Sequence, residues 1–270
     1  MHLKRSGSPR SRPLIRTASA VRTAAIAALL LSLGLLAGCG AEQTYQWGWY
    51  VLDPSLPKGA ANMRFMLTGL WLTISLSLSA IALAVLIGVL LALAGLSQSR
   101  LLRGFNRVYV ECFRAVPLLV LLLWVYYGLP VVTGLQFGTF AAGLITLALS
   151  DSAFEAEIFR AGIQSVARGQ REAAQTLGLS RWKTFRFIVF PQAIRTILPA
   201  LGNQFVYVLK MSSLVSVVGL QELTRRANEL NVTEYRPLEI YSFLVLEYLA
   251  LILVVSWGVR RLERRLSAGR

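Results

Sequence analysis

Residues 65–96 form a stretch of 32 residues without one charged side chain. An α-helix rises about 1.5 Å per residue, so this stretch is longer than a helix needs to cross the ~30 Å hydrocarbon core of a bilayer. A second uncharged stretch covers residues 115–150. Turn-forming sequences at 128–130 and 133–134 divide it into two segments. These runs predict an all-α integral membrane protein.

The composition fits five or six membrane helices. Of the 270 residues, 55% are hydrophobic, and the mean hydropathy is +0.57, which is too apolar for an ordinary soluble domain. We expect the second span to begin before Arg114 and to bend near Pro117. The approximate expected spans are 65–96, 115–128, 140–160, 197–220 and 238–259.

The distribution of Lys and Arg predicts the orientation of these spans. Alternate intervals between them hold four, seven and five basic residues on one side, and two, none and three on the other. The first side holds sixteen basic residues and the second side holds five. Because cytoplasmic loops carry an excess of Lys and Arg, we expect the first side to face the cytoplasm. The net charge of +15 therefore reflects basic residues that flank apolar runs, and nucleic-acid binding is disfavoured.

The richest cytoplasmic interval, residues 161–195, predicts a short helix, a turn and a second helix. Residues 161–177 have a helix-forming composition, and Gly178 is placed to end that helix in a left-handed conformation. Ser180 can cap the next helix, which Pro191 is expected to interrupt or kink. Such an element suits docking to a soluble partner.

This segment resembles the EAA loop of the membrane subunits of bacterial ABC importers. That loop has Glu-Ala-Ala, three residues, Gly, nine residues and Ile-x-Leu-Pro, and here Phe190 replaces the usual Leu. The matching positions are Glu172, Ala173, Ala174, Gly178, Ile188 and Pro191.

The resemblance extends to the polar amino-acid permeases and covers roughly residues 63–266. Phe154 stands where that branch often has Tyr, and Met211-Ser212 replaces a common Asp-Thr, which leaves the substrate open. The stretches that carry this wider resemblance are 113–119, 156–163 and 213–219.

The resemblance implies a five-helix type I ABC importer permease core over residues 63–270, located in the bacterial cytoplasmic membrane. It implies that the 161–195 loop couples this chain to a cytoplasmic ABC ATPase dimer through Glu172, Ala173, Ala174, Gly178 and Pro191. It also implies a second permease subunit, identical or homologous, an extracytoplasmic solute-binding protein and a polar amino-acid substrate. ATP and Mg are expected on the ATPase, because none of the four lysines here follows a glycine, as a phosphate-binding loop requires.

Residues 1–62 form a basic leader, a hydrophobic segment and an expected extracytoplasmic linker. The apolar run at 23–39 ends in Leu-Ala-Gly-Cys39, which resembles a lipoprotein signal whose cysteine is lipidated. A retained extra helix and a true start near Met63 or Met66 are the alternatives. Mass spectrometry of the mature N-terminus separates these three readings.

Charged residues inside spans are expensive and point to function. Asp151 and Glu155 lie four residues apart, on one face of the third span. Asn203 and Lys210 lie in the fourth span, and Lys210 can meet a substrate carboxylate or pair with Glu247. We expect Asp151, Glu155, Asn203 and Lys210 to be candidates for the substrate pathway, against the alternative that they pair or pack within the protein.

Catalysis by this chain is disfavoured. The only histidine is His2, and Cys39 and Cys112 are the only cysteines, so a Cys/His metal site cannot be assembled. No acid, base and nucleophile converge in the pattern. The alternative to a transport subunit is a membrane-anchored docking or assembly protein without a transport pathway.

Overall fold

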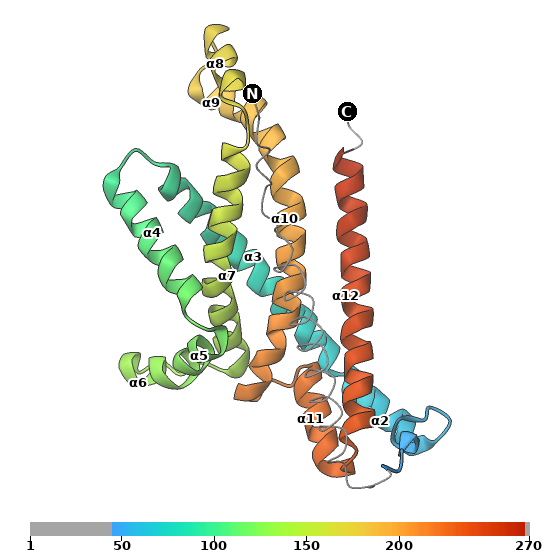
Figure 1. The fold of residues 1–270 in the computed structure, drawn as a ribbon. Coiled ribbons are helices and arrows are strands. Elements are labelled where there is room, and N and C mark those ends of the chain that lie inside the picture. The colour runs from blue at the N-terminus through green and yellow to red at the C-terminus, as the bar shows by residue number, and fades with distance from the viewer. Residues whose placement is uncertain (1–44, 268–270) are drawn as a thin grey trace, which may run out of the picture. The chain divides into compact units, whose positions relative to one another are not determined.

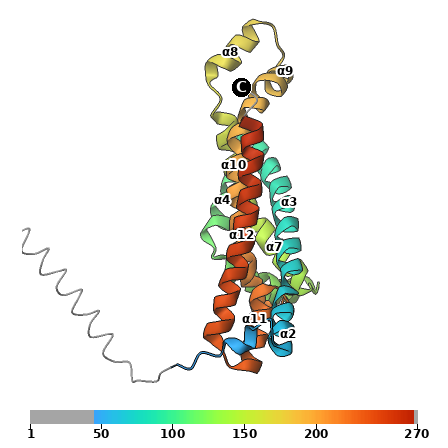
Figure 2. The same ribbon diagram turned by 90° about the vertical axis from the view of Figure 1, so that its right-hand side faces the viewer.

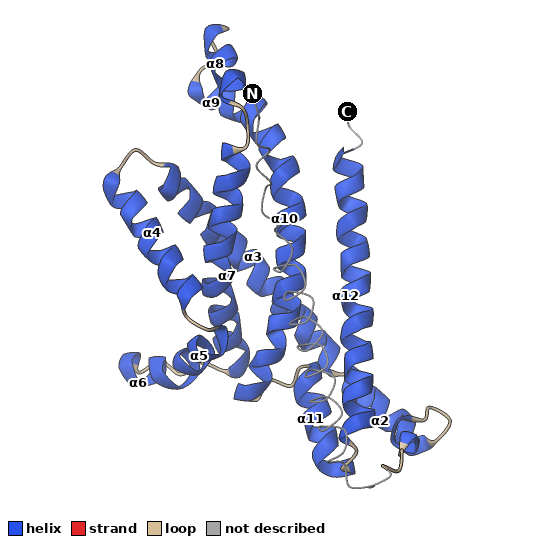
Figure 3. Ribbon diagram, in the orientation of Figure 1, coloured by secondary structure: helices blue, strands red, loops and turns tan. Residues whose placement is uncertain are grey.

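The computed structural model describes residues 45–267, with side chains through Arg265. Gly48 begins a compact unit that continues to the C-terminus, and the predictions for the leader, including Cys39, lie outside the described residues. Every regular element between residues 45 and 267 is helical (Figure 3). The α-helices are α2 (Pro57–Leu67), α3 (Gly69–Leu96), α4 (Arg100–Ala115), α5 (Leu118–Leu123), α6 (Leu129–Thr133), α7 (Thr139–Gln164), α8 (Arg168–Thr176), α9 (Arg181–Thr184), α10 (Phe190–Met211), α11 (Leu223–Glu234) and α12 (Pro237–Ser267).

Four shorter helical turns join these helices. The first and last are 3₁₀-helical, and the middle two are π-helical. They are η1 (Trp49–Leu52), η2 (Trp124–Gly128), η3 (Phe185–Val189) and η4 (Ser212–Val218).

Three helices in the described range are long and apolar enough to cross a membrane: Pro57–Leu96, Arg181–Val218 and Pro237–Arg265. A bent pair, Arg100–Ala115 with Leu118–Thr133, makes a fourth if it is one span. The expected third span is the 26-residue helix α7, whose interior carries four charged residues. The expected five-span order is therefore present as five helical segments (Figure 1).

The first segment starts earlier than its uncharged run suggests. Pro57 stands in the first turn of α2, where its missing N–H costs nothing, and only Thr68 separates α2 from α3. Small residues Ala80, Ala84 and Gly88 then recur every four positions and are buried. This spacing presents one narrow face, and α3 forms its most extensive helix contact with α7.

The second segment bends by 100° between α4 and α5. Val116 and Pro117 lie at this break with extended backbone, because the proline ring disfavours a helical conformation at the preceding residue. The predicted bend near Pro117 is confirmed, and α5 and α6 lead away from α4 in a new direction (Figure 1).

The helix around Pro191 continues where we expected an interruption or a kink. Residues 181–218 pass as one span, with the π-helical turn η3 directly before α10. Pro191 stands in the first turn of α10, where the extra residue of a π-turn absorbs the lost hydrogen bond. Further along, α10 packs closely on α12: a Cβ added at Gly202 would lie 2.2 Å from Val259 Cγ1.

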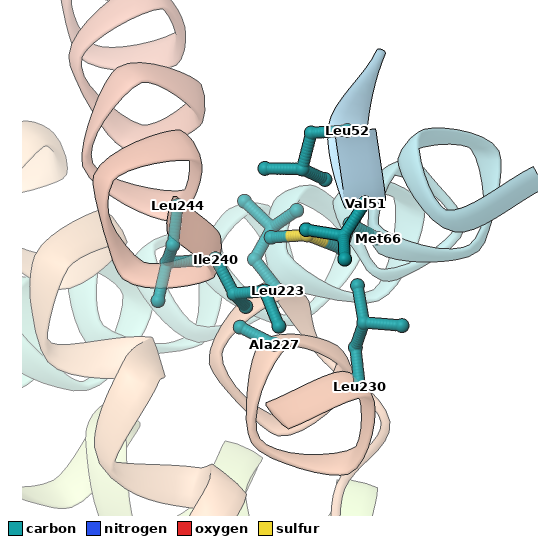
Figure 4. Close-up of a cluster of buried hydrophobic side chains, with 8 residues drawn as sticks. All are labelled: Val51, Leu52, Met66, Leu223, Ala227, Leu230, Ile240 and Leu244. Carbon is teal, nitrogen blue, oxygen red and sulfur yellow. The ribbon is translucent and has the colours of Figure 1, made fainter. Parts of the chain in front are cut away.

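The end of the unit opposite α8 and α9 is closed by an apolar cluster (Figures 2 and 4). Its members come from η1, α2, α11 and α12. They are Val51, Leu52, Met66, Leu223, Ala227, Leu230, Ile240 and Leu244.

A buried polar network lies beside this cluster. Glu222 Oε1 accepts a 2.8 Å hydrogen bond from the Arg225 amide at the start of α11, and Tyr248 of α12 donates to Glu222 Oε2 at 2.9 Å. Thr73 of α3 accepts a hydrogen bond from the Leu223 amide at 3.2 Å. These bonds join three helices, and burial raises the pKa of Glu222 from 4.5 to about 7.

Candidate functional site

The predicted coupling segment lies at the end of α7 and α10 (Figure 2). One continuous helix over 161–177 was expected, but α7 ends at Gln164 and α8 begins at Arg168. Arg171 donates a hydrogen bond to the Ile163 carbonyl at the end of α7, which satisfies an acceptor that the helix terminus leaves open. This contact ties the first turn of α8 back to the preceding span.

Gly178 ends α8 as the sequence predicted. Its φ is +77°, and its amide donates to the Gln175 carbonyl at 2.9 Å, while the Leu179 amide donates to the Ala174 carbonyl at 3.1 Å. This pair of bonds is a Schellman motif, which requires a left-handed residue. Ser180 then caps α9, as expected, by accepting from the Lys183 amide.

The five coupling candidates differ in how exposed they are and in where they lie in the segment. Glu172 and Ala173 are exposed on α8, whereas Ala174 is buried. Gly178 shapes the turn, and Pro191 is half-buried at the start of α10. Of the five, therefore, Glu172 and Ala173 are open to solvent, Ala174 packs inward, and Gly178 and Pro191 lie where the backbone turns or a helix begins.

Exposed aromatic and aliphatic side chains surround the same turn. Leu177 is 83% exposed, Trp182 70% and Phe187 65%. Beneath them, Val166, Val189, Ala193 and Ile197 form a buried cluster. An exposed apolar surface on a rigid base is typical of a protein-docking element.

The four pathway candidates are not brought into one open cavity. Asp151 and Glu155 are buried on α7, whereas Asn203 and Lys210 are exposed on α10. Gln204 of α10 donates a hydrogen bond to Asp151. Within the described residues Lys210 forms no ion pair with Glu247, whose carboxylate oxygens lack hydrogen-bond partners.

A polar cavity of about 360 Å³ lies between α3, α4 and α7, and the sequence did not reveal it. Four arginines and two glutamates line it, so it offers both signs of charge. Its lining is Gly95, Arg103, Asn106, Arg107, Val110, Glu111, Arg114, Glu157 and Arg160.

Two contacts order the inner part of this cavity. Arg160 and Glu157 form an ion pair of 2.5 Å, and the Arg114 guanidinium lies 5.2 Å from the centre of the Phe154 ring. The sequence signal was the recurrence of Arg103, Arg107 and Arg114 along one helical face. From the sequence these arginines are assigned to the cytoplasmic charge excess, with capping or anchoring of the bent helix as the alternative for Arg114. No group of three metal-ligating side chains occurs among residues 45–265.

Comparison with known proteins agrees with this architecture. The glutamine transport system permease protein GlnP of Escherichia coli (strain K12) is 35% identical over 223 residues, which are 82% of this chain and 99% of GlnP. The protein named "Probable glutamine ABC transporter permease protein GlnM" of Bacillus subtilis (strain 168) is 37% identical, over 76% of this chain and 95% of GlnM.

A solved structure shares the fold. The crystal structure of an amino acid ABC transporter with histidines matches with a TM-score of 0.75 and 36% identity, over 82% of this chain and 100% of that one. The family model of binding-protein-dependent transport system inner membrane components matches residues 84–268. This chain belongs to the family of binding-protein-dependent transport system inner membrane components.

Proposed function

We propose that this chain is the multi-pass permease subunit through which an ATP-driven importer moves a polar amino acid across the bacterial cytoplasmic membrane. The names of GlnP and GlnM, both glutamine permeases, support an amino-acid cargo. The side chain of the amino acid stays open, because a zwitterion presents the same carboxylate and ammonium whatever its side chain.

The observation that carries this proposal is the cavity between α3, α4 and α7. Its volume of about 360 Å³ is in the range of small-molecule sites, roughly 300–1,000 Å³. Arg107 and Arg114 can bind a carboxylate, and Glu111 can bind an ammonium group. A lining with both charge signs suits a zwitterion better than a simple anion.

The other four pathway candidates lie outside this cavity, and we propose two different roles for them. They are Asp151, Glu155, Asn203 and Lys210. Asn203 and Lys210 are exposed on α10 and can meet the amino acid directly. Asp151 and Glu155 are buried between helices, so they reach the pathway only when α7 and α10 separate. Such separation is what an alternating-access cycle requires.

We propose that the ATPase dimer docks on Glu172 and Ala173, in the frame set by Ala174, Gly178 and Pro191. ATP and Mg act on that partner, and ATP hydrolysis takes place there. A second permease, identical or homologous, completes the pathway, and an extracytoplasmic binding protein delivers the amino acid. This chain contributes the pathway and the docking element.

The test is uptake of radiolabelled glutamine by the full importer in liposomes. Arg114→Gln is expected to raise the KM at least tenfold, because it removes a carboxylate partner. Arg100→Gln lies on the same helix outside the cavity and is the matched control, expected to leave the KM unchanged. Equal KM values for the two variants would sink the cavity as the amino-acid site, and an importer that takes up no amino acid would favour a docking protein without a pathway.

A further inference from the structure

We propose that Asp151 and Glu155 form a proton-binding site inside the helix packing, in which the two carboxyls hold one proton between them. The site lies between α3, α7 and α10, and none of its residues lines the charged cavity described above. Its ligand is a proton taken from water.

Burial is the first observation. Asp151 is 3% exposed and Glu155 0%, and both lie near the middle of the 26-residue helix α7. Residues four apart on a helix are neighbours, with Cβ atoms about 5–6 Å apart. Two carboxyls are therefore enclosed side by side midway along α7.

The second observation is the lack of partners for their oxygens. Asp151 Oδ1 accepts a hydrogen bond from Gln204 Nε2. Asp151 Oδ2 and both carboxylate oxygens of Glu155 have no hydrogen-bond partner within the described residues. Three enclosed acceptors without a donor are costly, since each has lost its hydrogen bonds to water and gained none within the protein.

Within the described residues no Lys or Arg forms an ion pair with either carboxyl, and Lys210 of α10 is exposed. Helix α3 carries no charged residue, and a Cβ at its Gly88 would lie 2.5 Å from Glu155 Cβ, so the backbone of α3 packs directly on Glu155. From α10, the neighbouring polar groups are the Gln204 amide and Tyr207, whose ring lies 6.4 Å from that of Phe154.

The remaining charged and titratable groups nearby are engaged elsewhere. Tyr109 of α4 shares a 2.8 Å hydrogen bond with Ser152, and Arg114 lies over the Phe154 ring. On α7 itself, Glu157 is paired with Arg160. Among residues 45–265 the two carboxyls therefore have no ion-pair partner, and two adjacent negative charges without one cannot both persist in a low-dielectric interior.

One proton relieves both costs at once. A carboxylate takes up H⁺ and becomes a carboxylic acid, so the charge of the pair falls from −2 to −1. Its new O–H can donate to a free oxygen of the other carboxyl, which gives a partner to an otherwise orphaned acceptor. Aspartic acid dyads that share one proton obey the same physics.

The test is infrared spectroscopy of the full-chain permease in lipid vesicles, which needs neither ATP nor an amino acid and is independent of the proposed function. The carbonyl stretch of a protonated carboxylic acid is followed as the pH is raised from acid to alkaline. Wild type is expected to show such a band at neutral pH, to which Glu222 also contributes and which exceeds that of each pair variant by the equivalent of about one carboxyl per chain. Glu155→Gln and Asp151→Asn should each lose that share of the band, or shift its titration by one pH unit or more.

Glu263→Gln, on α12, is the matched control and is expected to keep the wild-type band at neutral pH. A wild-type spectrum without that band, or one that both pair variants leave unchanged, would overturn the proposal. Loss of the band on addition of Na⁺ at constant pH would also overturn it, because it would identify a metal-cation site instead. The use of two variants keeps the test decisive if one of them fails to fold.

Discussion

Gly162 on α7 lies directly against Ile197 on α10: a Cβ at position 162 would be 2.3 Å from Ile197 Cγ1 and 2.9 Å from Cδ1. These two helices lead into and out of the coupling segment, so their close approach fixes the base on which α8 and α9 stand. The side chain of Ile197 is 2% exposed and has little room to move.

Gly162→Val is expected to lower the free energy of unfolding by about 1–3 kcal/mol, the usual cost of overpacking. Thermal unfolding in detergent measures the change. Gly104→Ala is the control, because Gly104 lies in α4 with nothing within 4 Å of its added Cβ. There the substitution should stabilise by about 0.5–1 kcal/mol, and a loss of similar size in both variants would contradict the packing argument.

Gly178→Ala is expected to impair transport and copurification of the ATPase. No atom lies within 4 Å of a Cβ at position 178, but its φ of +77° is left-handed, which costs a residue with a side chain about 1–2 kcal/mol. Gly178→Asp and Glu172→Lys should abolish both transport and copurification of the ATPase. Gly178→Asn should reduce them less than Gly178→Ala does. Gly169→Ala, on α8 without a left-handed φ, serves as control, and normal ATPase copurification with Gly178→Asp would count against the docking proposal.

Thr73→Val is expected to cost about 1–3 kcal/mol of stability, because it leaves the buried Leu223 amide without its acceptor. The shape of the side chain is nearly unchanged, so the loss reports the hydrogen bonds of the hydroxyl, which also donates to the Gly69 carbonyl at 3.2 Å. Thr133→Val at an exposed position on α6 provides the comparison. Equal thermal midpoints for the two variants would show that α11 does not depend on this bond.

Glu222 predicts a pH dependence of stability. Burial raises its pKa from 4.5 to about 7, so the folded chain binds this proton more tightly than the unfolded chain. The stabilisation is complete below pH 4.5 and is lost as the pH rises toward about 7. Glu222→Gln should flatten that part of the curve of melting temperature against pH, and a variant whose curve keeps the wild-type slope would refute the assignment.

The order of spans could be predicted from the sequence because charges at the ends of apolar runs are local signals. Gly178 and Ser180 behaved as predicted for the same reason: a left-handed glycine and a capping serine act within one turn. The interruption of 161–177 was not predicted, because the bond from Arg171 to the Ile163 carbonyl spans eight residues. The helix continues through Pro191 because of the π-helical turn η3, and such a turn has no clear sequence signature.

The charged cavity could not be predicted because it depends on how helices meet. Arg114 and Glu157 lie 43 positions apart and face the same space only because α4 packs against α3 and α7. Nor does any local pattern tell that Glu155 is enclosed while Lys210, on the next span, is exposed. Spacing predicts which residues share a helix face, but the tertiary packing decides what that face contacts.

The uninterrupted helix from Arg181 to Met211 has a mechanical consequence. It packs closely on α12 at Gly202 and Val259, a point that divides it into unequal arms. At about 1.5 Å per residue, the arm from Gly202 to Trp182 is roughly 30 Å long and the arm to Met211 roughly 14 Å. If the helix tilts about Gly202, its two ends move in opposite directions. The movement at Met211 is then about half as large as the movement at Trp182.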